Sequence, residues 1–204
     1  MAASSRPEAP LAAADSARVA ALLDFWFGAP GTPEHGRERE VWFERDAEFD
    51  RTCGGFRADH ERAASGAYDG WLSERDANLS LVLLLDQFPR NLFRYSPRAY
   101  ASDAAARRAA RNAIARSFDR QLAPARRRFV YMPFMHSESL ADQERSVALF
   151  ATMQDAGNSG ALRSARRHRE IVARFGRFPH RNAILGRQTT VEEARFLAGP
   201  DAAF

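Results

Sequence analysis

The sequence LSLVLLLDQFPRNLFR, residues 79–94, decides the fold of this chain. Residues 79–85 are apolar on every helical face except at Ser80, which predicts a helix that is packed on all sides. The chain then continues without a loop into Asp86, Gln87, Phe88, Pro89, Arg90 and Asn91. Because buried polar groups without partners are costly, we expect partners for these groups elsewhere in the molecule.

Helical periodicity dominates the rest of the chain. After Asp15 and Ser16, which can cap a helix, apolar residues recur at helical spacing at Val19, Leu22, Leu23, Trp26 and Phe27. Ser139 with Asp142, and Thr190 with Glu193, have the spacing of capping boxes. No β-alternation of useful length is present. The sequence therefore predicts an all-α fold, a stack of eight or nine helices in antiparallel pairs.

Length and composition favour one domain. The chain has 204 residues, and we expect a single all-helical domain over residues 15–204. Residues 1–14 are rich in Ala, Pro and Ser and are predicted to form a loose tail. The longest apolar stretch is far shorter than the roughly 20 residues of a membrane-spanning helix. With no signal-peptide pattern and the single Cys53, we expect a cytoplasmic protein without a disulfide, a metal site or a cofactor.

The net charge of +4 would suit a protein that binds nucleic acid, but the chain contains no lysine and all 30 basic residues are arginine. A GC-rich genome would favour arginine regardless of function. The arginine count therefore does little to distinguish a nucleic-acid-binding protein from a protein with another function. The absence of lysine excludes a lysine nucleophile or Schiff base.

Two later motifs resemble the polar end of the 79–94 stretch. The segment Phe178-Pro179-His180-Arg181-Asn182 repeats its Phe-Pro element followed by Arg and Asn. A third motif, His136-Ser137-Glu138, follows a proline-containing apolar segment. We expect the three motifs to form one polar pocket. Its predicted binding residues are Asp86, Arg90, Asn91, His136, Glu138, His180, Arg181 and Asn182.

Each motif also has a structural interpretation, and the sequence leaves it open. Asp86 and Arg90 are spaced for an ion pair within one helix, and Arg90 can bind the carbonyl groups of a helix interrupted by Pro89. His136 can cap a helix or bridge core groups. The Phe178-Pro179 element can end a helix and dock its aromatic ring, with the polar residues at 180–182 solvated. His168 lies on an apolar stripe, and a hydrogen-bonded core position is the simpler interpretation of that residue.

Three long motifs carry a resemblance to a known family. LLLDQFPRN at 83–91, YMPFMHSE at 131–138 and FGRFPHRNAILGR at 175–187 closely resemble the bacterial domain-of-unknown-function family number 924. The resemblance covers about residues 19–197 and implies a TPR-like all-α fold. It implies no catalytic residues. The chain lacks the 34-residue period of TPR repeats, so the implied likeness to them is architectural.

Three functional hypotheses follow, in this order. The first is a helical scaffold whose pocket binds a small anion or a peptide carboxylate through Arg90 and Arg181. The second is a hydrolase or lyase in which His136 is the acid/base and Glu138 orients it. The third is an arginine-mediated nucleic-acid binder.

Overall fold

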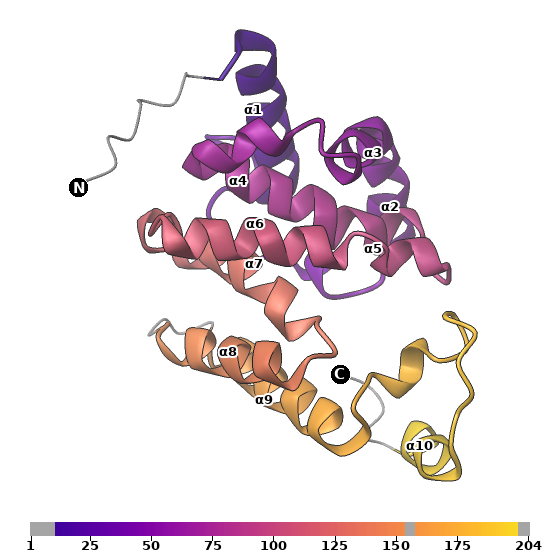
Figure 1. Ribbon diagram of the computed structural model, residues 1–204. Coiled ribbons are helices and arrows are strands. Elements are labelled where there is room, and N and C mark those ends of the chain that lie inside the picture. The colour runs from indigo at the N-terminus through magenta and orange to yellow at the C-terminus, as the bar shows by residue number, and fades with distance from the viewer. Residues whose placement is uncertain (1–10, 154–157, 200–204) are drawn as a thin grey trace, which may run out of the picture.

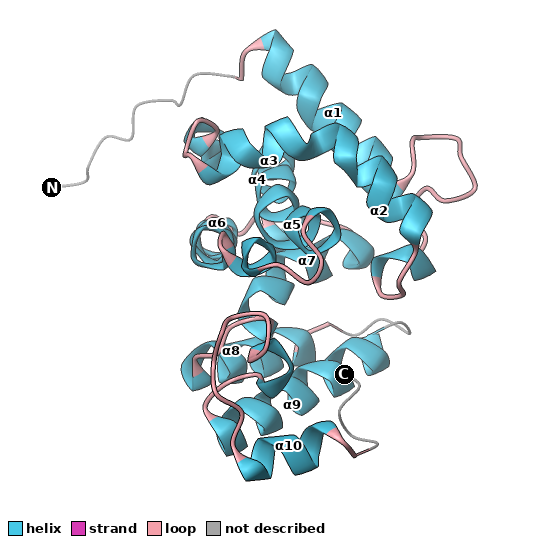
Figure 2. Ribbon diagram, turned by 90° about the vertical axis from the view of Figure 1, so that its right-hand side faces the viewer, coloured by secondary structure: helices cyan, strands magenta, loops and turns pink. Residues whose placement is uncertain are grey.

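The computed structural model describes residues 11–153 and 158–199, and every regular element within these ranges is helical (Figures 1 and 2). The predicted all-α class is confirmed. The α-helices are α1 (Ala13–Phe27), α2 (Ala47–Cys53), α3 (Arg57–Ala64), α4 (Arg75–Val82), α5 (Phe88–Leu92), α6 (Asp103–Ala115), α7 (Pro124–Met135), α8 (Leu140–Ala151), α9 (Asn158–Phe175) and α10 (Val191–Leu197). No helix in the described ranges combines the length and the apolar character needed to cross a bilayer.

The apolar pattern predicted for the first helix is confirmed in α1, but the helix begins earlier than predicted. All five residues of the pattern are buried, and Trp26 and Phe27 each pack edge-on against Phe129 of α7. The helix starts at Ala13 without a side-chain cap, so Asp15 lies inside the first turn, where its charge suits the helix dipole. The predicted tail over residues 1–14 is therefore two residues too long, and most of it lies outside the described residues.

The central helix is α4, continued through a π-helical turn, Leu83–Gln87, into α5. Each side chain from Leu79 to Leu85 is at most 1% exposed, as the sequence predicts. Full burial of such a side chain contributes roughly 1.5–3 kcal/mol to folding. This continuous helix is the axis around which α1, α6 and α7 pack.

The π-turn is explained by Pro89, which has no N–H to donate into the helix. The N–H of Phe88 instead reaches back five residues to the carbonyl of Leu83. Two carbonyls of the turn accept bonds from other segments: Leu84 from His60 Nδ1 at 2.8 Å, and Leu85 from the Ser102 hydroxyl at 2.6 Å. The backbone groups released by the proline are thus satisfied by side chains from distant segments.

Helices α7, α8 and α9 pack in chain order, and α8, α9 and α10 lie together beneath α1–α7 in both views (Figures 1 and 2). The capping box of Thr190 and Glu193 at the start of α10 is confirmed. The one predicted at Ser139 and Asp142 is wrong, because the Asp142 carboxylate binds the Ser137 hydroxyl instead. Leu140, the first residue of α8, is 43% exposed.

The buried apolar side chains form two clusters, and the larger one extends from α1–α7 to Phe150 of α8 and Ala165 of α9. The larger contains most of the buried side chains of α1–α8. The smaller is built from Ile171, Val172 and Phe178, with Phe175 and Phe196 packed against it. Polar side chains fill much of the space where the two groups meet.

Candidate functional site

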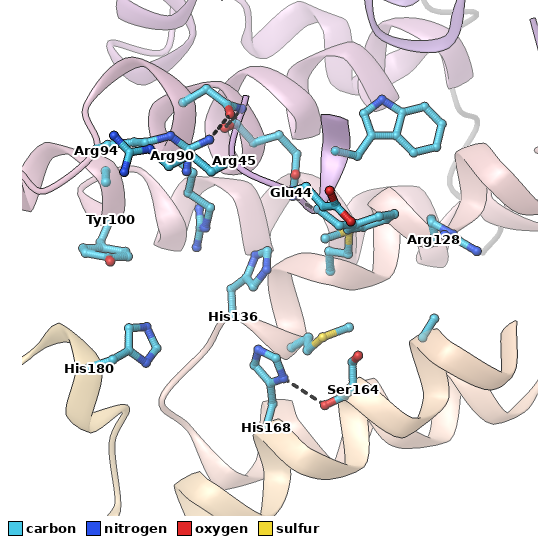
Figure 3. Close-up of a pocket in the computed structure, with 18 of the residues that line it drawn as sticks. Glu44, Arg45, Arg90, Arg94, Tyr100, Arg128, His136, Ser164, His168 and His180 are labelled. Atoms are coloured by element: carbon cyan, nitrogen blue, oxygen red, sulfur yellow. Dashed lines mark hydrogen bonds between the residues drawn. The ribbon is translucent and has the colours of Figure 1, made fainter. Parts of the chain in front are cut away.

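A cavity of about 1000 Å³ lies between the two groups of helices (Figure 3). One wall includes Arg90 of α5, Tyr100 and His136, and the other includes His168 of α9 with Arg181. A cavity of this size accommodates a small organic molecule. The three predicted motifs therefore all contribute residues to one cavity, although not every predicted residue lines it.

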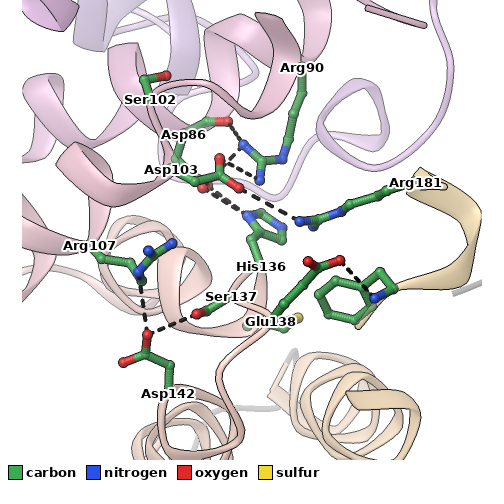
Figure 4. Close-up of polar contacts among 12 residues, drawn as sticks. Asp86, Arg90, Ser102, Asp103, Arg107, His136, Ser137, Glu138, Asp142 and Arg181 are labelled. Carbon is green, nitrogen blue, oxygen red and sulfur yellow. Dashed lines mark hydrogen bonds and ion pairs between the residues drawn. The ribbon is translucent and has the colours of Figure 1, made fainter. Parts of the chain in front are cut away.

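The Asp86–His136 pair joins two of these motifs. His136, at the C-cap of α7, has its Nδ1 atom 2.9 Å from both carboxylate oxygens of Asp86, which is fully buried in the π-turn (Figure 4). Gln87 Nε2 donates to the same carboxylate at 2.6 Å. Because a carboxylate accepts, Nδ1 carries the proton and Nε2 of a neutral imidazole keeps its lone pair.

Electrostatics favour an ionised Asp86 and a neutral His136. Burial by itself would raise the pKa of Asp86, but the charges of Arg90 and His136 outweigh it and hold that pKa below its ordinary value. Burial lowers the pKa of His136, and Arg90 lowers it further, against the opposing effect of Asp86. At neutral pH the pair is therefore a carboxylate that orients an unprotonated base.

A second carboxylate, Asp103 at the start of α6, connects the two arginines. Arg90 Nη2 lies 3.0 Å from Asp103 Oδ1, and Arg181 Nη1 lies 3.7 Å from Oδ2 (Figure 4). Arg90 Nη1 also lies 3.3 Å from Asp86. Burial raises the pKa of Asp103. Asp86, Arg90, Asp103 and Arg181 thus form a row of alternating charges. Arg181, at its end, shares the Asp103 carboxylate with Arg90 and lies beyond hydrogen-bond distance from it.

Arg181 is unusual for a buried cation. It is 6% exposed, and its guanidinium lies 4.6 Å from the centre of the Tyr100 ring and 4.5 Å from that of Phe178. Its Nε atom is buried without a hydrogen-bond partner in the described chain. Burial and the neighbouring Arg90 lower its pKa to about 10. This side chain stays charged at neutral pH, and Asp103 balances its charge only in part.

Glu138 has a different role from the predicted one. Its carboxylate accepts the N–H of Phe178 at 2.8 Å and binds Arg187 at 2.7 and 3.0 Å. The carboxylate next to His136 is Asp86, so Glu138 does not orient the imidazole. Glu138 instead joins the segment after α7 to the segment that carries Arg181, and it borders a smaller second cavity.

The two predicted asparagines differ. Asn91 lines the cavity, where its Oδ1 accepts from Arg94 at 2.9 Å and its Nδ2 donates to the Gln87 carbonyl at 3.1 Å. Asn182 is fully buried away from the cavity, and its Nδ2 lies 3.3 Å from Glu193 at the start of α10. The assignment of Asn182 to the pocket is therefore wrong. Its neighbour His180 is exposed and lines the cavity.

The sequence interpretation missed Tyr100, Asp103 and His168. Tyr100 ends the short 3-10 turn Pro97–Tyr100, and Asp103 is the first residue of α6. His168 is hydrogen-bonded to the Ser164 carbonyl at 2.8 Å, yet it also lines the cavity (Figure 3). No local pattern distinguishes such positions from ordinary helix residues.

Other reactive groups lie apart from the cavity. Cys53 is fully buried, and burial raises the pKa of its thiol to about 12, so it stays protonated at neutral pH. Within residues 11–153 and 158–199, no three His, Cys, Asp or Glu side chains are grouped as metal ligands.

Comparisons with known proteins agree with the fold. Residues 22–201 match the model of a family described as "Bacterial protein of unknown function (DUF924)". The solved structure of a protein of unknown function, ATU0120 from Agrobacterium tumefaciens, is similar with a TM-score of 0.80 and 42% sequence identity, over 90% of this chain and 98% of that one. A search of curated proteins finds no match. The three motifs, the helical fold and the match along most of the chain show that this protein belongs to the DUF924 family of bacterial proteins.

Proposed function

We propose that the cavity binds a small organic anion that has an apolar body. The observation that carries this proposal is Arg181, whose buried guanidinium has an unpartnered Nε and lies at the cavity wall. A carboxylate or phosphate beside it would supply the missing acceptor and offset the repulsion between Arg181 and Arg90.

The other cavity arginines support this choice, because most of them already have counterions. Arg94 forms a two-point ion pair with Asp50, and Arg128 pairs with Glu38. Arg45, at the rim, stacks on Tyr95 and forms no ion pair with another described residue. Among the arginines that line the cavity, Arg45 and Arg181 therefore carry the positive charge that is least balanced by described carboxylates.

The remaining lining is suited to an apolar body. In Figure 3, Arg128 and Glu44 lie on the side opposite Arg90 and Arg94, with His136 between them. The apolar side chains that line the cavity are Trp42, Phe43, Ala99, Met132, Met135, Phe150, Ala161 and Ile184. Apolar walls with a few placed charges are the usual composition of a small-molecule site.

Calorimetric titration and thermal shift test this proposal. The probes are 3-phenylpropionate and phenyl phosphate, their neutral analogue 3-phenylpropionamide, and a short peptide with either a free or an amidated C-terminus. We expect the anions to bind and raise the melting temperature and the neutral analogue to do neither. The peptide pair separates a free small anion from a peptide carboxylate as the ligand.

Arg181→Gln is the decisive variant, because it keeps a polar side chain and removes the charge. We expect it to weaken anion binding by about 10-fold or more, as for loss of a charge-assisted hydrogen bond. Arg108→Gln, which removes an exposed partner of Asp69, is the matched control and should bind normally. Equal affinity of Arg181→Gln and wild type, or no stabilisation by any anion, would contradict the proposal.

The nucleic-acid hypothesis gains less support. Three arginines of α9 have acidic partners: Arg167 with Glu170, Arg169 with Glu144 and Arg174 with Glu192. These pairs reduce the positive potential along the helix, so we rank the binding of a small anion above the binding of nucleic acid.

A cytoplasmic location stays a prediction, which cell fractionation tests.

A further inference from the structure

His136 lines two cavities and not only the one proposed to bind the anion. A smaller cavity of about 430 Å³ is also lined by His136, and it shares Tyr100 and Arg181 with the larger one. Its other lining side chains are mainly polar and include Asp103, Ser137, Glu138 and Asp142. Such a space is suited to water.

The imidazole has the features of a general base. Its Nδ1–H is held by both oxygens of the buried Asp86, which fixes the tautomer and leaves the lone pair on Nε2. Among the described residues, Asp86 is the only hydrogen-bond partner of the His136 side chain. No serine, threonine or cysteine in the described part of the chain is hydrogen-bonded to this imidazole, and we assign the role of nucleophile to water.

We propose that the protein is a hydrolase in which His136 activates a water molecule from the smaller cavity to cleave an ester bond of the anion in the larger cavity. This inference rests on the proposed function, since the larger cavity must hold the substrate. His136 is the catalytic residue, and Asp86 is a positioning residue that acts through it. Arg181 borders both cavities and holds negative charge beside the reacting group.

Hydrolysis proceeds through a tetrahedral intermediate. The water oxygen adds to the ester carbonyl carbon while Nε2 of His136 takes one water proton, which gives a tetrahedral oxyanion and an imidazolium. The oxyanion lies beside Arg181, and the imidazolium is stabilised by Asp86. The carbon–oxygen bond to the leaving group then breaks, and the imidazolium returns its proton to the departing oxygen. The products are a carboxylic acid and an alcohol, and His136 is neutral again.

The test uses 4-acetoxybenzoate, an aryl ester that carries a carboxylate, and its neutral methyl ester. We expect wild type to release 4-hydroxybenzoate and to favour the anionic ester. His136→Gln should lower kcat by about 100-fold or more with little change in KM. Arg181→Gln should mainly raise KM. His35→Gln is the control, because His35 lies in the loop after α1, bonded to the Gly28 carbonyl, and lines neither cavity.

The pH profile separates positioning from structural support. The charged and titratable groups that interact with His136 are Asp86, Arg90, Asp103, His168 and His180, and Arg181 lines the same two cavities. Since Asp86 raises the pKa of His136, Asp86→Asn should lower kcat and move the acid limb of kcat/KM to lower pH, in a protein whose circular dichroism is native. His136→Gln should abolish that limb.

The outcomes separate the two proposals. If 4-acetoxybenzoate binds in an Arg181-dependent way but its hydrolysis is absent or unchanged in His136→Gln, the hydrolase is wrong and the binding proposal stands. If neither 4-acetoxybenzoate nor the other anions bind, both proposals are wrong. If kcat falls in His136→Gln and the Asp86→Asn limb moves as expected, the hydrolase is supported.

Discussion

His136 and Asp86 are 50 residues apart in the chain, and the histidine Nδ1 atom lies 2.9 Å from each oxygen of the aspartate. The contact joins the π-turn of the central helix to the C-terminus of α7. A buried carboxylate with this geometry fixes both the tautomer and the direction of the imidazole. The pair therefore defines where a base can act in the cavity wall.

Ser102→Ala tests whether the π-turn depends on its side-chain partners. The Ser102 hydroxyl donates to the Leu85 carbonyl at 2.6 Å in a buried setting. Its removal leaves that carbonyl unsatisfied, and we expect the free energy of unfolding in urea to fall by about 1–3 kcal/mol. Ser65→Ala, which removes an exposed bond to the Arg62 carbonyl, should change it by less than about 0.5 kcal/mol. Equal effects of the two variants would contradict this account.

Anion affinity should rise as the pH falls below neutrality. The pKa of Asp103 is raised, so Asp103 gains its proton at a higher pH than an ordinary aspartate, and this protonation removes a negative charge from between Arg90 and Arg181. Protonation of His136 acts in the same direction. A sulfonate is the suitable probe because it stays ionised throughout, and calorimetry measures its affinity.

Asp103→Asn imitates the protonated carboxyl group. We expect it to bind the sulfonate more tightly at pH 7, on the order of 10-fold, with a flatter dependence on pH. An affinity that is unchanged or weaker at pH 7 in a folded variant would show that Asp103 does not compete with the ligand.

Glu138→Gln separates structural support from catalysis. The variant loses the charge that binds Arg187 and weakens the acceptor for the Phe178 N–H. We expect a loss of about 1–2 kcal/mol in the free energy of unfolding and faster hydrogen exchange around residue 178. The pH profile of hydrolysis should keep its acid limb. A limb displaced as in Asp86→Asn would restore Glu138 as the group that orients His136.

Glu170→Gln is the matched control for that variant. Its carboxylate is exposed and forms a single ion pair with Arg167 at 3.4 Å. Exposed pairs of this kind contribute about 0–1 kcal/mol, so we expect a smaller change in stability.

Acid should destabilise the fold through His168. Burial lowers the pKa of His168 from its ordinary value of 6.5 to about 3, with His136 adding to the effect. Between these values the unfolded chain binds a proton that the folded chain does not, so stability falls as the pH falls. We expect the melting temperature to drop between pH 6.5 and 4, and His168→Gln to reduce the slope while His35→Gln leaves it unchanged.

Local patterns in the sequence predicted much of the fold. The apolar stretch 79–85, the helical spacing in α1 and the capping box at Thr190 each depend on residues within one or two turns of one another. The spacing and the cap that predict these helices lie within one segment of chain, although the packing of α1, α6 and α7 completes the burial of residues 79–85.

The site depends on contacts between distant segments, and the sequence alone did not predict which polar residues form those contacts. Glu138 is two residues from His136 and was the obvious partner, yet the structure supplies Asp86. Asp103 looked like an ordinary residue at the start of a helix, and Asn182 resembled Asn91 in its motif although it faces α10. Which of several similar polar residues faces a cavity is set by packing that no local pattern contains.

The π-turn at Leu83–Gln87 has a consequence for how this family can vary. A π-turn holds one residue more than an α-helical turn in the same place. Deleting a single residue there would force Pro89 into a regular α-helical turn, where its ring clashes with the carbonyl four residues earlier and it donates no N–H. The bonds that His60 and Ser102 make to the carbonyls of the turn would be lost as well. We therefore expect insertions and deletions to be tolerated in the loops of this chain but not between residues 83 and 91.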